Sequence, residues 1–101
     1  MTESISPQLL KVLTDVTGEV HLESALRIVT QEAIDHRLAR LATEIHALEQ
    51  QYGLSFEEFA ARFQREEIPH QHSYEVEQSY LEWEGLLCRQ RRLQEVRAWL
   101  P

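Results

Sequence analysis

Apolar residues recur at spacings of three and four along a stretch without Gly or Pro, from residue 22 to residue 52. This spacing predicts one amphipathic helix, and over more than two heptads it is typical of helices that pair along their length. The apolar positions fall in two registers, which are Leu22, Leu26, Val29 and Ala33, then Ile34, Leu38, Leu41, Ile45, Leu48 and Tyr52. At about 1.5 Å per residue such a helix is roughly 45 Å long, so it needs an apolar neighbour along its length.

Capping residues predict three shorter helices around the long one. Ser6 before Pro7 suits a helix start, and Thr17-Gly18 suits its end. Gly53 suits the left-handed residue that closes the long helix. The predicted helices cover residues 7–15, 22–52, 55–65 and 73–99.

The start of the third helix is specified by two motifs. Ser55 and Glu58 have the spacing of a capping box, and Leu54 and Phe59 stand at the two positions of a hydrophobic staple. Apolar residues then repeat at helical spacing, namely Phe56, Phe59, Ala60 and Phe63. In the last helix the steps of four, three and four are Val76, Tyr80, Trp83 and Leu87, and Pro69 marks the connection before it.

Length and composition favour one all-α domain over residues 1–101. Three Gly and three Pro leave room for few turns, and 43% apolar with 27% charged residues is ordinary for a folded chain. We expect a long central helix with shorter helices, forming a helical hairpin or bundle that dimerisation completes. The expected dimer interface is the ladder on the long helix, which comprises Leu38, Leu41, Ile45 and Leu48.

The net charge of −7 disfavours nucleic acid as a partner, because phosphate binding draws its affinity from Lys and Arg. Residues 66–88 contain six glutamates and no Lys or Arg, and arginines follow from Arg89 onward. This order complements the dipole of the last helix. It also suits an acidic face that meets a basic partner, or two copies that pair antiparallel.

Aromatic residues lie among these glutamates. Tyr74, Tyr80 and Trp83 can be plain core, or they can anchor a partner, since Tyr and Trp join a large apolar area to a polar tip. The candidate partner-binding residues are Tyr74, Glu75, Glu77, Tyr80, Glu82, Trp83 and Glu84.

Catalytic and metal-binding motifs are weak or lacking in the sequence. His70 and His72 precede Glu75 and Glu77, but two histidines two residues apart are no recognised ligand spacing, so we expect a solvated turn and neither metal nor cofactor. Cys88 lies in an apolar stripe and is expected to be a small buried hydrophobe. The sequence shows no phosphate loop, nucleophile elbow or Cys pair, and we expect no enzyme activity.

No apolar run in the sequence approaches the about 18 residues of a membrane span, and MTESISPQLL lacks the basic start and apolar block of a signal peptide. A single cysteine fits a reducing compartment. We therefore expect a soluble cytoplasmic chain without membrane contact.

The motif YGLSFEEF with the downstream HSYEVEQSYLEWE resembles a group of small prokaryotic antitoxin-type proteins. In that group a long helix ends in Tyr-Gly, a Ser-Phe-Glu-Glu-Phe helix follows, and an acidic helix with a Trp-Glu pair completes the chain. The resemblance covers about half of the sequence. It implies that the protein binds and neutralises a cognate toxin encoded beside it, and the acidic segment suits a toxin with a basic surface.

The first half of the chain is similar in layout to the two helices of a ribbon-helix-helix unit. MTESIS lacks the basic, alternating strand that such a unit places in the DNA major groove, which argues against operator binding. The leading hypothesis is therefore an antitoxin-like homodimer that acts by stoichiometric binding. The alternatives are a small metal-binding, ferritin-like helical protein and a dimeric DNA-binding regulator.

Overall fold

The computed structural model describes residues 4–101 and contains α1 (Pro7–Thr17), α2 (Leu22–Tyr52), α3 (Phe56–Gln64) and α4 (Tyr74–Trp99). Residues 4–101 include no strand, which confirms the all-α prediction. Each helix begins and ends within two residues of its predicted range. Residues 1–3 lie outside the described residues, and with them the start of the MTESIS segment considered above.

Serine caps start three of the four helices. The hydroxyls of Ser6, Ser55 and Ser73 accept hydrogen bonds from the backbone amide three residues later, at 3.2, 3.2 and 3.3 Å. Each bond satisfies one of the amides that a helix start leaves without a partner. At the far end of α2, Gly53 adopts the expected left-handed conformation with φ of 66°. The chain therefore reverses direction where the sequence predicts it.

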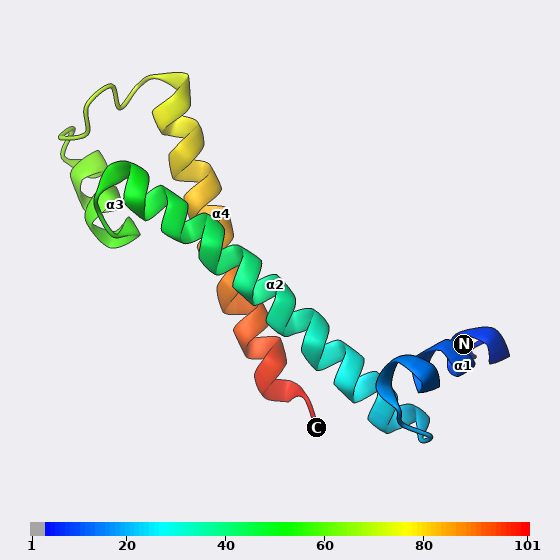
Figure 1. Cartoon of the computed structure of the whole chain (residues 1–101). Helices are drawn as coiled ribbons and strands as arrows, with labels where there is room; N and C mark the ends of the chain where they lie inside the picture. The colour runs from blue at the N-terminus through cyan, green and yellow to red at the C-terminus, as the bar shows by residue number, and fades with distance from the viewer. Residues whose placement is uncertain (1–3) are drawn as a thin grey trace.

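The molecule is an elongated helical hairpin with one short helix at each end. α2 and α4 run side by side in opposite directions, α3 lies at the end where α2 finishes, and α1 lies at the other end, beside the start of α2 (Figure 1). The chain measures 58 × 30 × 23 Å, and its radius of gyration is 19.7 Å. A compact domain of this length has a radius of gyration of about 13 Å, so much of the surface of each helix stays uncovered.

The core is concentrated at the α3 end, in what we call the aromatic cluster. Trp83 of α4 and Phe59 of α3 have no exposed surface, and their ring centroids lie 5.2 Å apart. Tyr52 lies 4.7 Å from Phe59, and Phe56 lies 5.4 Å from Trp83. Tilted and edge-on rings at these distances attract one another beyond the effect of buried area. The other buried members are Ile45, Leu48, Ile68 and Val76.

Away from the cluster, α2 and α4 are joined by a thin apolar seam. Ile34 and Leu41 of α2 and Leu93 of α4 are buried. Arg97 approaches Asp35 at 3.2 Å, an ion pair that links the two helices across the seam. Nearer the start of α2 the burial fades, since Ala25 is the one buried residue of its first three turns. No described helix is long and apolar enough to cross a membrane.

Candidate partner-binding surface

The ladder assigned to a dimer interface is largely covered within one chain. Leu41, Ile45 and Leu48 are buried, and Leu38 is half-buried. Ile45 and Leu48 belong to the aromatic cluster, while Leu41 lies on the seam with α4. The last helix of the same chain thus supplies the apolar neighbour that the long helix requires. A surface for a second chain has to come from other side chains.

The three candidate aromatic anchors differ in their exposure to solvent. Trp83 is fully buried, and the Tyr80 ring lies 4.9 Å from the Phe63 ring. Trp83 belongs to the aromatic cluster and cannot serve as an anchor unless the hairpin opens, whereas Tyr80 is half-buried and packs against the cluster. Tyr74, by contrast, is 79% exposed. Of the two alternatives, core packing describes Tyr80 and Trp83, and Tyr74 is free to meet a partner.

The candidate glutamates all lie in solvent and flank an apolar line on α4. Tyr74 and Leu81, which is 63% exposed, lie seven residues apart and therefore on the same side of the helix. We call this side, opposite the buried Val76–Trp83 side, the outer face of α4. The glutamates beside it are Glu75, Glu77, Glu82 and Glu84, all exposed. Leu81 was not among the predicted residues, although its seven-residue spacing from Tyr74 is visible in the sequence.

Cys88 continues the same spacing, seven residues after Leu81, and it is exposed. The prediction of a buried Cys88 was wrong. The buried side of α4 runs through Trp83 and the half-buried Leu87, and the next residue is turned by about 100° away from it. Its thiol therefore lies on the outer face.

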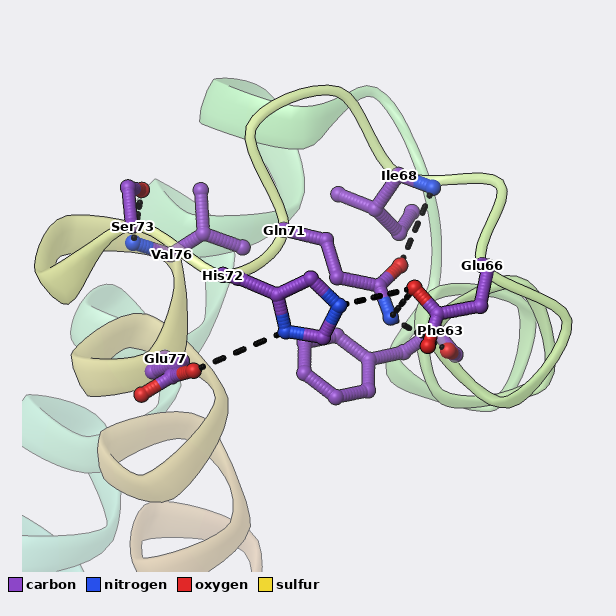
Figure 2. Close-up of polar contacts among 8 residues, drawn as sticks. All are labelled: Phe63, Glu66, Ile68, Gln71, His72, Ser73, Val76 and Glu77. Atoms are coloured by element: carbon purple, nitrogen blue, oxygen red, sulfur yellow. Dashed lines mark hydrogen bonds and ion pairs between the residues drawn. The ribbon is translucent and has the colours of Figure 1, made fainter.

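The connector between α3 and α4 is folded around a buried glutamine. Gln71 is 5% exposed, and its side-chain amide donates to the Phe63 carbonyl at 2.7 Å and to the Glu66 carboxylate at 3.1 Å (Figure 2). Its carbonyl oxygen accepts from the Ile68 backbone amide at 3.3 Å. Buried backbone groups need such partners, because leaving one unpaired costs about 1–3 kcal/mol. Gln71 thereby fixes the start of α4 relative to the end of α3.

His72 lies on the outside of this connector, between two carboxylates. Its Nε2 lies 2.8 Å from Glu66 Oε2, and its Nδ1 lies 3.8 Å from Glu77 Oε1 (Figure 2). His70 has a left-handed backbone, with φ of 56°. Residues 4–101 contain no group of three or more His, Cys, Asp and Glu side chains placed to hold a metal ion. His72 thus lies between a glutamate of the connector and a glutamate in the first turn of α4, and it links the two segments.

A second exposed surface lies at the other end of the molecule, and we call it the N-terminal apolar surface. α1 has no buried residue, although much of its sequence is apolar. Exposed apolar side chains also continue through the turn into the first turns of α2. The members of this surface are Leu9, Leu10, Val12, Val16, Val20, Leu22 and Leu26.

Comparison with protein-family models, with curated proteins and with solved structures finds no match to this chain in any of the three.

We predict that Gln71→Glu lowers the free energy of unfolding by about 2 kcal/mol, because the new carboxylate cannot donate to the Phe63 carbonyl or to Glu66. Urea unfolding followed by circular dichroism measures the change. Gln78→Glu, the same substitution at an exposed position of α4, serves as the control and should stay within about 0.5 kcal/mol of the unmodified protein. Equal unfolding midpoints for the two variants would show that Gln71 does not hold the connector.

Proposed function

We propose that this chain is an antitoxin-type protein that binds a basic partner stoichiometrically through the outer face of α4 and has no catalysis of its own. It forms a homodimer through the N-terminal apolar surface. It works in the cytoplasm, where the exposed thiol of Cys88 stays reduced. The observation that carries the proposal is the exposed apolar side chains that the hairpin leaves at both ends.

The homodimer is supported by α1. An isolated helix of eleven residues is marginal in water, and most helices gain their stability by burying an apolar side. α1 has apolar side chains at helical spacing, yet none of its residues is buried in the single chain. Leu9, Val12 and Val16 are exposed and lie on one side of α1 by their spacing of three and four, and exposed apolar side chains gathered on one side of a helix are typical of interaction sites. A second copy of α1 is the simplest apolar surface available to cover it.

The basic partner is supported by the composition of the outer face. Tyr74 and Leu81 offer exposed apolar area, and the four glutamates beside them make no ion pair with Lys or Arg among residues 4–101. An apolar centre with a charged rim is the usual anatomy of a protein interface. A partner with basic residues would satisfy the rim, which fits the toxin that the antitoxin resemblance implies.

The two surfaces lie at opposite ends of the hairpin. The first turns of α4 are at the α3 end, whereas α1 lies at the far end of α2 (Figure 1). A dimer joined through α1 therefore leaves both outer faces open. Such a dimer can bind two partner molecules, one on each copy.

We predict that Val12→Gln combined with Val16→Gln converts the dimer to a monomer without unfolding the hairpin, because both side chains are exposed in the single chain. Light scattering at micromolar concentration gives the mass, and circular dichroism gives the helix content. Lys11→Gln combined with Asp15→Gln is the matched control on α1, and it should leave the dimer intact. A monomeric mass for the unmodified protein would contradict the proposal.

We predict that the apolar and the acidic residues of the outer face affect different rates, namely dissociation and association of the complex. Tyr74→Ala with Leu81→Ala should speed dissociation from the protein encoded by the adjacent gene by about tenfold or more, because buried apolar anchors set the lifetime of a complex. Glu77→Gln with Glu84→Gln should instead slow association at low salt and have less effect at high salt. Surface plasmon resonance measures both rates.

The control for these variants is His36→Ala on the exposed side of α2, which should change neither rate. If the adjacent-gene product binds both outer-face variants with unchanged rates, the interface lies elsewhere. An adjacent-gene product that fails to bind the unmodified protein would contradict the antitoxin assignment itself.

A further inference from the structure

Three arginines meet at a pocket in the middle of the hairpin. Arg37 and Arg40 of α2 and Arg89 of α4 line a depression of about 180 Å³, together with Leu41, Leu93 and Glu44. The residues from α2 lie three, four and seven positions after Arg37, so they share one side of that helix. Arg89 lies one turn before Leu93 on α4. Packing of the two helices thus brings together cations that are about fifty residues apart in sequence.

These guanidinium groups have no carboxylate partner among residues 4–101. Arg27, Arg65, Arg92 and Arg97 each lie within 4 Å of a Glu or Asp oxygen. Within the described part of the chain, Arg37, Arg40 and Arg89 make no such ion pair, and Glu44, which also lines the pocket, does not approach them to that distance. The chain has 17 acidic and 10 basic residues, so acidic partners were available in its composition. Three like charges around one depression repel one another, and a bound anion would relieve that repulsion.

The pocket is lined by apolar as well as charged side chains. Leu41 and Leu93 are buried members of the seam, so they present fixed apolar surface beneath the charged groups. Arginine stems can pack along such surface while the guanidinium stays at the opening. Charges interact more strongly beside apolar surface than in open water, because the local dielectric is lower. Guanidinium groups also present their donors in a planar fork that matches phosphate and carboxylate oxygens.

We propose that this pocket binds a phosphate group in its dianionic form. Three arginines and Glu44 give the pocket a net charge of +2, which a phosphate monoester, with about −1.5 to −2 at pH 7, neutralises more completely than a single carboxylate does. The pocket lies between the outer face of α4 and the N-terminal apolar surface and includes residues of neither. Phosphate binding at this pocket therefore needs neither of the two proposed interfaces.

Isothermal titration of the unmodified protein with inorganic phosphate, phenyl phosphate and benzoate, at constant ionic strength, tests the assignment. We expect one site for each phosphate compound and weaker binding of benzoate. Arg37→Gln and Arg89→Gln should each weaken phosphate binding about tenfold, the usual effect of removing one charged hydrogen bond. Arg91→Gln is the matched control, since Arg91 is exposed on α4 but does not line this pocket. The affinity of this variant for phosphate should stay within about twofold of that of the unmodified protein.

Comparison of the two phosphate compounds identifies the source of the group: tighter binding of phenyl phosphate indicates an ester, and equal binding indicates free phosphate. Either result supports the site, provided that it depends on Arg37 and Arg89. The proposal is overturned by absent binding at millimolar phosphate, or by equal weakening in the Arg91→Gln control. It is also overturned if Arg37→Gln and Arg89→Gln change the mass of the protein in light scattering and leave phosphate binding unaltered, because the arginines would then serve carboxylates of a second copy.

Discussion

The burial of Trp83 against Phe59 is the contact on which the rest of the structure depends. It joins α4 to α3, and through Tyr52 it joins both to the end of α2. The Trp83 indole N–H is buried without a hydrogen-bond partner in the structure, which costs about 1–3 kcal/mol. Removing roughly 200 Å² of aromatic surface from water contributes about 5 kcal/mol, so burial outweighs that cost. The hairpin therefore closes at the aromatic cluster.

This closure determines which surfaces remain available. Once α4 is fixed at the cluster, it covers the apolar ladder of α2 through Leu41 to Ile34. The seam is one side chain deep, so the opposite sides of both helices stay in solvent and the molecule stays elongated. Tyr74 and Leu81 then lie outside because they are on the far side of the helix that buries Trp83. The same packing brings Arg89 beside Arg37 and Arg40.

The helices could be located from the sequence because capping residues near their ends set most of their limits. Ser6, Ser55, Ser73 and Gly53 act on the backbone within one turn of themselves, and that chemistry is visible in any single sequence. The heptad ladder was equally visible, and the last helix was expected to cover part of it. How far that cover extends could not be predicted, because the same spacing suits a helix of the same chain or of a second one.

Features that depend on contacts between distant residues could not be predicted in this way. Gln71 is an ordinary polar loop residue in the sequence, and only the fold shows its bonds to the carbonyl of Phe63 and the amide of Ile68. The apolar spacing places Trp83 and Tyr74 on different sides of α4, but only the packing against α3 shows that the side of Trp83 is buried and that of Tyr74 exposed. The arginine pocket joins two helices whose register is known only once they pack.

One chain closes its own hairpin and leaves the apolar side chains of α1 exposed, and we propose that a second copy covers them. Hydrogen exchange followed by mass spectrometry, at protein concentrations below and above the point where light scattering detects association, tests it most directly. We expect amides of α3, α4 and the second half of α2 to be protected at every concentration, and amides of α1 to gain protection only on association. This arrangement is wrong if amides of α1 are as well protected in the monomer as those of α4, or if the hairpin loses its protection on dilution.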